Sequence, residues 1–324
     1  ALPIFELAVR HLVAHRLQAR HDDAAASVDR QNLVAPSVRD EESGMALRRS
    51  LLEAFVDHAG AASFLQGEVA SICRVGGAIH VALADGRVIE TALVVGADGR
   101  GSRVRELARI GVDRWAYDQQ ALTLILRHDR PHRGAVHEWL RPGGPLATLP
   151  LPGRRTGVTW VERPGEARRL KDLPGDELVA AFDRATGGVL GRVELDSGPV
   201  AYPLGAQHAR QYVAPRLALV GDAAHGVHPI HAQGFNMGVA DVGALVDAVV
   251  TARSRGQDIG SGEALLPYAR ARRADNTQRL WLTDGLVRIF TAAETKMKIP
   301  TTTIPSKTSA AQAPNQNIPG HFPR

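Results

Sequence analysis

The 324-residue sequence contains few cysteines, few aromatic residues and no long apolar run. A single cysteine, Cys73, cannot form an intramolecular disulfide, so we expect a reducing compartment and no metal site held by a cysteine pair. Only 5% of the residues are aromatic and the arginines are dispersed, which argues against nucleic acid as a partner despite a formal net charge of +5. Because 44% of the residues are hydrophobic, the sequence predicts an ordinary basic globular protein.

No apolar segment reaches the length expected of a membrane span, and residues 1–20 lack the cleavage pattern of a signal peptide. We therefore expect a cytoplasmic protein. Residues 1–20 are amphipathic and basic, which favours a docked surface helix. The same pattern leaves peripheral association with the inner face of an anionic membrane as an alternative.

Two apolar runs each end in a glycine and an aspartate, and a helical pattern follows each of them. The first is ALVVGADGRGSRVREL, in which Asp98 and Gly99 turn the chain and Ser102 is placed to cap the helix. Arg103 and Arg105 are placed to reach a phosphate, although this copy alone would be interpreted as a tight turn with surface arginines. The repetition of the pattern favours a ligand site.

The second run is LALVGDAAHGVHP, where the strand 217–220 is followed by Gly221 and Asp222. In open α/β sheets, ligands bind at the carboxyl ends of the strands. After Pro229, the sequence AQGFNMG begins a helix whose unpaired N–H groups near residues 234–236 should face the same crevice. A carboxylate and a helix N-terminus together suit a ligand that carries hydroxyl groups and negative charge.

The rest of the sequence predicts a discontinuous first domain with a second domain inserted into it. Helical patterns cover residues 45–60, 176–185 and 263–290, and strand-like runs cover 64–69, 78–83, 88–95, 121–129, 135–144, 146–153 and 156–163, with a turn at 84–86. The predicted parts are an atypical polar segment at 1–44, a first domain at 45–112 and 215–290, an antiparallel-sheet domain at 113–214, and a disordered tail at 291–324.

Three histidines spaced three residues apart, His225, His228 and His231, raise the question of a metal site. Pro229 interrupts any helix that would align them, so we expect loop histidines beside a ligand and no metal. The sequence has no G-x-S-x-G elbow and no Walker loop, which leaves hydrolase and P-loop functions without support.

VVGADGRGSRVR resembles the Asp-Gly motif, and LALVGDAAHGVHPIHAQGFNMGVADVGAL the Gly-Asp motif, of FAD-dependent aromatic hydroxylases of the hydroxybenzoate hydroxylase type. Three segments, HPI…QGFNMG, RPGGPLATLPLPG and YARARRADN…LTDGLVRIF, are most similar to the ubiquinone-biosynthesis hydroxylases of the 2-octaprenyl-6-methoxyphenol hydroxylase type. The similarity covers about residues 45–290. It implies an α/β (α+β overall) fold, in which an incomplete FAD-binding Rossmann-like domain carries an inserted antiparallel-sheet substrate domain.

The resemblance implies FAD as cofactor, NADH or NADPH as co-substrate, and hydroxylation of a hydrophobic phenol by O₂, as a cytoplasmic enzyme or within a biosynthetic complex at the membrane. It places Asp222 at the ribitol hydroxyls, and Pro229 and Gly234 at the reactive edge of the flavin, with no side-chain acid or base. The full set of cofactor-binding residues that it implies is Asp98, Gly99, Arg105, Gly221, Asp222, Ala223, Pro229, Gln233, Gly234, Phe235 and Asn236.

Two departures from the family pattern are visible. Many members have glycine where Ala232 stands, and a methyl group is tolerated there if the φ of the residue is negative. The sequence also lacks the strand, G-x-G-x-x-G loop and helix that receive the FAD pyrophosphate, so we expect a family member without its first βαβ unit. The alternative function is therefore a non-catalytic remnant or binding subunit that holds a quinone precursor or a protein partner.

Overall fold

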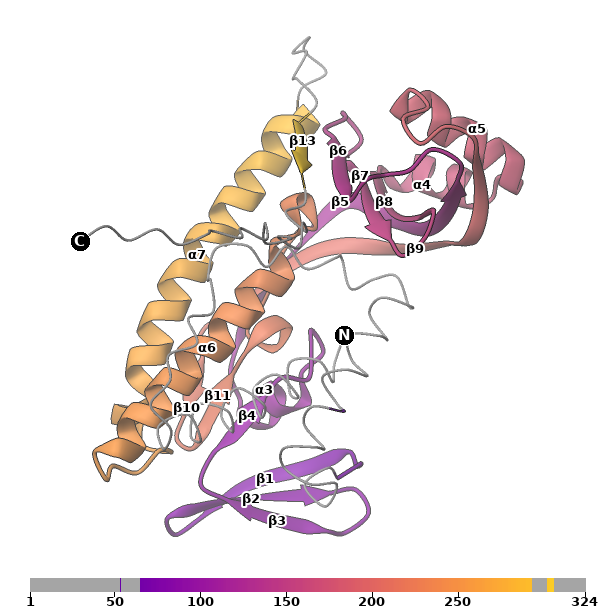
Figure 1. Ribbon diagram of the computed structural model, residues 1–324. Helices are drawn as coiled ribbons and strands as arrows, with labels where there is room; N and C mark the ends of the chain where they lie inside the picture. The colour runs from indigo at the N-terminus through magenta and orange to yellow at the C-terminus, as the bar shows by residue number, and fades with distance from the viewer. Residues whose placement is uncertain (1–52, 54–64, 293–301, 306–324) are drawn as a thin grey trace, which may run out of the picture.

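The computed structural model describes residues 53, 65–292 and 302–305 (Figure 1). Within them the strands form three sheets, with the orders β1-β2-β3, β10-β11-β4 and β12-β9-β5-β8-β7-β6-β13. The helix predicted at residues 45–60 and most of the polar segment before it lie outside the described residues.

A mixed sheet carries the two glycine-aspartate motifs. β4 (Val94–Gly96) pairs in parallel with β11 (Leu217–Leu219), and β11 pairs in antiparallel with β10 (Val213–Ala214). The helices α3 (Arg103–Leu107), α6 (Gln233–Ser254) and α7 (Gly262–Ala292) accompany this sheet. Residues of all these elements share one buried core, because β11 is apolar on both faces, as expected of a central parallel strand.

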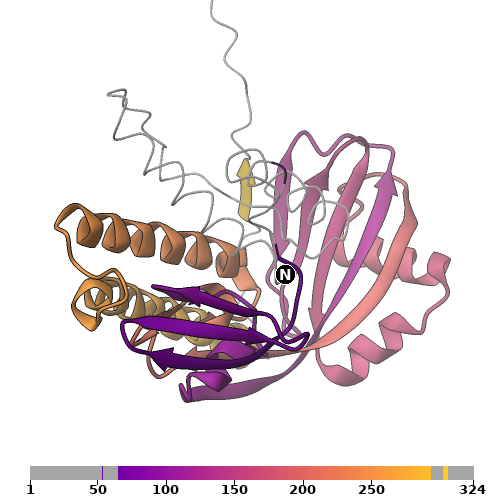
Figure 2. The same ribbon diagram turned by 90° about the horizontal axis from the view of Figure 1, so that it is seen from below.

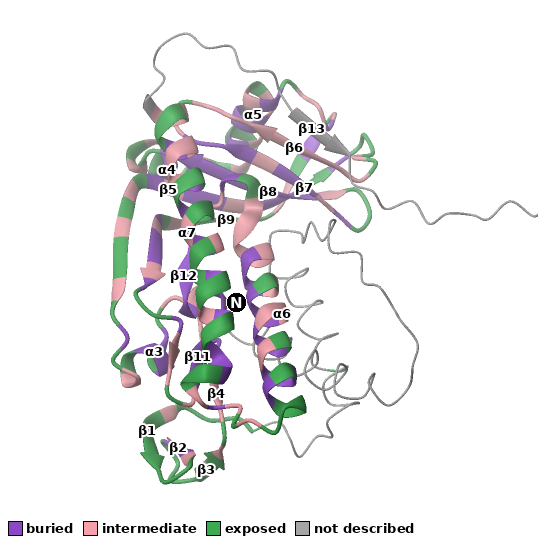
Figure 3. Ribbon diagram, turned by 90° about the vertical axis from the view of Figure 1, so that its left-hand side faces the viewer, coloured by how far each residue is buried: buried purple, intermediate pink, exposed green. Residues whose placement is uncertain are grey.

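α6 and α7 lie side by side along one flank of the molecule (Figure 1). The segment Ile230–Ser254 is long and apolar enough to cross a membrane, contrary to the expectation that no segment would be. Of its most apolar window, 56% is buried inside the protein, so in this fold the segment acts as a core helix. In Figure 3, α7 is largely exposed along the face turned toward the viewer.

A small antiparallel sheet precedes the first motif, at the lower end of Figure 1. It consists of β1 (Val69–Val75), β2 (Ala78–Leu83) and β3 (Val88–Thr91). The strand predicted at residues 64–69 is instead β1, because a two-residue turn at Gly76 and Gly77 pairs residues 69–75 with β2. The run predicted at 88–95 divides into β3 and β4, which belong to different sheets.

The large antiparallel sheet contains β5 (Val112–His128), β6 (Ala135–Trp139), β7 (Leu146–Leu151), β8 (Arg155–Glu162), β9 (Val193–Ala209) and β12 (His225–Gly226). The helices α4 (Pro164–Lys171) and α5 (Gly175–Thr186) share a buried apolar cluster with it and lie on one side of it (Figure 2). β5 and β9 have 17 residues each and extend toward the mixed sheet (Figure 1). β9 pairs there with β12, so the large sheet reaches the second motif directly.

The prediction of a disordered tail at residues 291–324 is wrong at residues 302–305. Thr302–Pro305 forms β13, which pairs in antiparallel with β6. The physical reason is that a short segment containing two β-branched threonines and an isoleucine meets the edge of a sheet, where it completes the ladder.

Candidate functional site

The two motifs lie together because their strands are neighbours. β11 and β4 are in parallel register, with Leu219 opposite Gly96, so the turns that follow them leave the same edge of the sheet. Gly96 allows this close packing, since a Cβ built on it would lie 2.8 Å from Leu219 Cδ2 and 2.9 Å from Val104 Cγ1. Strand register therefore brings the two turns to the same edge of the sheet.

Arg100 joins the two motifs physically. Its Nε donates to Asp222 Oδ2 at 3.3 Å, Nη1 donates to Gly205 O at 2.7 Å, and Nη2 donates to Val227 O at 3.1 Å. One side chain of the first motif therefore contacts β9, the aspartate of the second motif and the histidine loop. Sequence reasoning did not select Arg100, and the only signal for it is its place between the glycines of GADGRGS.

Asp222 lies at the start of a short turn and keeps part of its carboxylate accessible. The 3-10 turn η2 (Gly221–Ala223) follows β11, and 33% of the Asp222 side chain is exposed. Its backbone carbonyl accepts a 2.7 Å hydrogen bond from Gln207 Nε2 of β9. Because the backbone is held and Oδ2 contacts Arg100, the carboxylate has a fixed direction and still has room to accept hydrogen bonds from a ligand.

The buried carboxylate of Asp241 also holds the Gly221–Ala223 turn in place. Gly221 has φ 58°, a conformation that favours glycine, and its N–H donates to Asp241 Oδ2 at 3.0 Å. Asp241 is fully buried on α6 and also contacts His225 Nε2 at 2.6 Å, Arg272 Nε at 2.8 Å and Asn276 Nδ2 at 2.9 Å. We call Asp241 and these three side chains the Asp241 cluster.

Gly99, Asp98 and Ser102 of the first motif form the turn between β4 and α3. Gly99 turns the chain at φ 83°. Asp98 accepts from Ser102 Oγ at 2.5 Å and from Val104 N at 3.0 Å, while Ser102 caps α3 as predicted by accepting from Arg105 N at 3.0 Å.

Arg105 is buried, and its terminal nitrogens donate to Ala223 O at 2.7 Å and to Arg100 O at 2.8 Å. Its guanidinium therefore supports the Gly221–Ala223 turn from inside, whereas the sequence analysis had placed it near a phosphate. A buried cation that satisfies two backbone carbonyls joins the motifs more directly than a surface arginine would.

The three histidines have separate environments. His225 belongs to the Asp241 cluster. His228 is buried and contacts Gln119 Oε1 at 3.1 Å. His231 is 43% exposed and its Nδ1 lies 3.1 Å from Glu138 Oε2 of β6, a hydrogen bond that raises the pKa of His231 above its ordinary value. The expected metal-free arrangement of loop histidines is compatible with these contacts, because the three imidazoles do not converge on one point.

The start of α6 has features that suit an anionic ligand group. Among the described residues no side chain caps this 22-residue helix, and its first turn contains no acidic residue. Pro229, Gln233, Gly234, Phe235 and Asn236 are all half-buried. In the described part of the chain, a Cβ built on Gly234 would come no closer than 3.7 Å to Val227. The positive end of the helix dipole lies at this turn.

Ala232 enters α6 in a strained conformation. Its φ is 48° and its ψ is 36°, and the preceding His231 has φ 58°. The condition under which a methyl group would be tolerated at position 232, a negative φ, is therefore not met. The left-handed conformation costs a residue with a Cβ about 1–2 kcal/mol.

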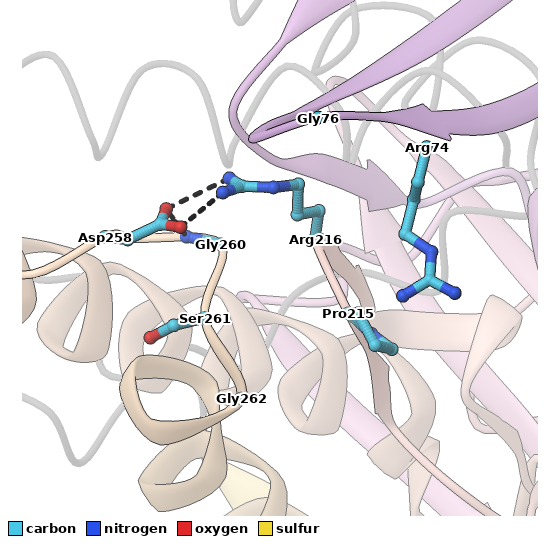
Figure 4. Close-up of a pocket in the computed structure, with 8 residues that line it drawn as sticks. All are labelled: Arg74, Gly76, Pro215, Arg216, Asp258, Gly260, Ser261 and Gly262. Atoms are coloured by element: carbon cyan, nitrogen blue, oxygen red, sulfur yellow. Dashed lines mark hydrogen bonds and ion pairs between the residues drawn. The ribbon is translucent and has the colours of Figure 1, made fainter.

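A separate cavity of about 570 Å³ lies beside the turn between β1 and β2 (Figure 4). Arg216, Asp258 and the residues Gly260–Gly262 line it, and Arg216 forms an ion pair with Asp258 across its wall (Figure 4). None of the residues predicted from the motifs lines this cavity, and one of its two arginines, Arg216, already has an anionic partner. We therefore assign the candidate site to Arg100, Asp222 and the start of α6.

Comparison with known proteins identifies relatives of the whole motif region. The sequence pattern of the FAD binding domain family matches residues 45–280. The chain is 44% identical to the ubiquinone hydroxylase UbiL of Rhodospirillum rubrum over 212 residues, which cover 65% of this chain and 49% of UbiL. It is 37% identical to the 3-demethoxyubiquinol 3-hydroxylase of Escherichia coli, over 71% of this chain and 59% of that enzyme. The chain thus spans about half the length of these curated relatives.

Solved structures give the same fold. The crystal structure of pqsL, a probable FAD-dependent monooxygenase from Pseudomonas aeruginosa, aligns with a TM-score of 0.69 at 23% sequence identity. The alignment covers 90% of this chain and 95% of pqsL. The predicted combination of a Rossmann-like part with an antiparallel sheet is therefore confirmed at the level of the fold.

Proposed function

Because this chain belongs to the FAD binding domain family, a family of FAD-dependent aromatic hydroxylases, we propose that it hydroxylates a polyprenylated phenol in ubiquinone biosynthesis. The observation that carries the proposal is that Arg100 donates both to Asp222 Oδ2 and to the carbonyl of Val227, in the loop that leads into α6. The curated relatives support the substrate class, since both are named as hydroxylases of ubiquinone or its precursor.

The residues present fit the flavin half of FAD. A carboxylate that is one-third exposed and directed by Arg100 suits the ribitol hydroxyls, which are hydrogen-bond donors. The small side chain of Gly234 and the positive end of the α6 dipole, near which no described side chain caps the helix, suit the pyrimidine part of the ring. We propose Asp222, Pro229 and the segment 234–236 as the residues that hold the flavin.

Bound FAD would transfer electrons from NADH or NADPH and activate O₂ for insertion of one oxygen atom into the phenol ring. The protein provides position and charge stabilisation. The N–H groups at the start of α6 would stabilise negative charge that develops on the ring, as donors of an oxyanion hole do. Ile230, which follows Pro229 in the sequence, is 1% exposed, and a buried apolar side chain at this position would help to keep water away from the reacting edge.

Titration of the purified chain with FAD, followed by quenching of flavin fluorescence, tests the proposal directly. Asp222→Ala removes a charged hydrogen-bond acceptor worth about 1.5–3 kcal/mol, so FAD should bind roughly 10- to 100-fold more weakly. Glu106→Gln changes an exposed carboxylate on the neighbouring helix α3 and should leave the affinity unchanged. With a prenylated phenol, the wild-type chain should couple oxidation of NADH or NADPH to O₂ uptake.

A wild-type chain that neither binds FAD nor oxidises NAD(P)H would contradict the proposal. That outcome would favour the alternative, a binding subunit that holds a quinone precursor. FAD binding that Asp222→Ala leaves intact would instead show that the flavin does not use this carboxylate.

A further inference from the structure

A second cavity, of about 760 Å³, lies between β5 and the C-terminal half of α7. Its α7 wall includes Thr277, Leu280, Trp281, Val287 and Thr291, whose spacing places them on one face of the helix. The volume lies within the roughly 300–1,000 Å³ typical of sites for small organic molecules. No residue that the motif analysis assigned to the cofactor lines this cavity.

The β5 wall of the cavity is an irregular stretch of strand. Between Ala116 and Gln120 the pairing with β9 shifts, because β9 advances only from Gly205 to Pro203 over the same interval. Tyr117 and Gln119 lie in this bulge, and both line the cavity. Bulges often redirect side chains beside functional sites.

The bulge connects the cavity to the loop at the flavin site. Gln119 Nε2 donates to Gly143 O at 2.7 Å, which leaves its Oε1 directed at His228 Nε2, 3.1 Å away. The Tyr117 ring meets the His228 imidazole edge to face, with centroids 5.0 Å apart. His228 immediately precedes Pro229, so the inner wall of the cavity and the loop at the reacting edge share a buried contact.

The lining combines apolar and uncharged side chains with charged ones. Asp113, Asp118, Arg163 and Arg288 are exposed, whereas the Asp284 side chain is 14% exposed and forms a 2.7 Å ion pair with Arg288. Leu280 is buried and Trp115 is half-buried, while Trp281 is 74% exposed at the rim. Burial raises the pKa of Tyr117 to about 12 and lowers the pKa of His208 to about 4, so both are neutral near pH 7. A lining of this kind favours an uncharged, elongated apolar group over an anion or a peptide with charged side chains.

We propose that this cavity binds the isoprenoid chain of the substrate, with the chain between Gln119 and the exposed rim at Trp281. The assignment rests on the function proposed above, because it supplies the chain-bearing phenol. It goes beyond that function because it places the site that selects a prenylated substrate between β5 and α7, away from the residues proposed to hold the flavin.

A chain-length series tests the assignment. Isothermal titration calorimetry would measure binding of phenol and of phenols with one, two or three isoprene units to the purified chain, with and without FAD. Burial of even two of the five carbons of an isoprene unit corresponds to about tenfold in affinity, so each unit should tighten binding by about tenfold or more until the cavity is filled.

Thr277→Phe places a ring in the cavity, whereas Gln278→Phe adds the same ring at an exposed neighbour that does not line it. We expect Thr277→Phe to weaken binding of the three-unit compound by at least tenfold, and Gln278→Phe to leave it unchanged. Ala116→Phe narrows the cavity from the opposite wall and should act like Thr277→Phe. It keeps the test decisive if Thr277→Phe fails to fold.

Equal affinity for the whole series, or an unchanged chain-length gain in Ala116→Phe and Thr277→Phe, would overturn the assignment. The two proposals fail separately. Chain-length-dependent binding without FAD binding would contradict only the proposed hydroxylase function. FAD binding together with NAD(P)H oxidation, but without any chain-length dependence, would contradict only the cavity.

Discussion

Asp241→Asn is the substitution that most directly probes how the site is held. It preserves the shape of a fully buried side chain and removes its charge. The wild-type carboxylate contacts Gly221 N, His225 Nε2, Arg272 Nε and Asn276 Nδ2 at 2.6 to 3.0 Å. An amide offers one acceptor oxygen and introduces an NH₂ group, so at least one of these donors would face another donor.

The expected loss of stability is large. Removal of one partner from a buried ion pair costs about 3–5 kcal/mol, because the remaining charge stays desolvated. Arg272 is only 9% exposed but keeps contacts with Asp275 and Asn276, so we place Asp241→Asn near the lower end, at about 3 kcal/mol. Against a typical unfolding free energy of about 5–15 kcal/mol, this is a major fraction.

The pH dependence of the stability difference between wild type and Asp241→Asn is a second, independent test, because its direction follows from the pKa of Asp241. Burial acts to raise the pKa of Asp241, but His225 and Arg272 together hold it below its ordinary value. A lowered folded-state pKa contributes stability that is present above the unfolded-state pKa of about 3.9, and this stability is lost as the pH falls through the folded-state pKa. The difference between wild type and Asp241→Asn should therefore be full at pH 7 and shrink in acid.

Urea unfolding followed by circular dichroism at pH 7 and at about pH 2, well below the unfolded-state pKa of about 3.9, would measure both effects. Glu177→Gln, which changes an exposed carboxylate on α5, is the control and should change stability by no more than about 0.5 kcal/mol. A loss below about 1 kcal/mol for Asp241→Asn at pH 7, or a difference that grows in acid, would refute the reasoning.

Two further predictions concern the loop that enters α6. Ala232→Gly should stabilise the protein by about 0.5–1 kcal/mol, because glycine adopts a φ of 48° without strain and loses only some backbone entropy on folding. Ala240→Gly, at an exposed position inside α6, should instead destabilise the protein by about 1 kcal/mol. Thermal unfolding of both variants measures the two changes. NMR titration should give His231 a pKa above about 6.5, and this pKa should fall toward about 6.5 in Glu138→Gln. The stability that this pair contributes should be full below about pH 6.5 and lost as the pH rises through the folded-state pKa of His231. A His231 pKa that is unchanged in Glu138→Gln would contradict the role of Glu138.

Strand register explains why the main features of the site could be predicted from sequence. The apolar run 217–220 predicts a buried strand of a parallel sheet, and β11 is such a strand, with β4 as its parallel neighbour. Ser102 as the cap of α3 followed from residue type and spacing alone. These features depend on local chemistry and on a rule of sheet topology, both of which sequence reasoning captures.

Long-range contacts explain what could not be predicted. Arg100 contacts carbonyls and a carboxylate 105 to 127 residues away, and no local pattern encodes that geometry. β9 was missed because Gly198, Pro199 and Gly205 interrupt its alternation, although its 17 residues pair along β5. The burial of Arg105 is decided by which carbonyls surround it, so its sequence signature is the same as that of a surface arginine.

The position of Asp222 is set from three independent directions. Register with β4 fixes the strand before it, Asp241 holds the N–H of Gly221 from below, and Gln207 and Arg100 hold the residue from the side of the large sheet. All of these groups lie between residues 94 and 241, and α7 adds Arg272 and Asn276, which contact Asp241. The carboxylate is therefore oriented by the core itself and does not depend on a bound ligand for its direction. A preorganised acceptor loses little entropy on binding, so the affinity of the flavin half should reside in a few fixed groups, with Asp222 foremost.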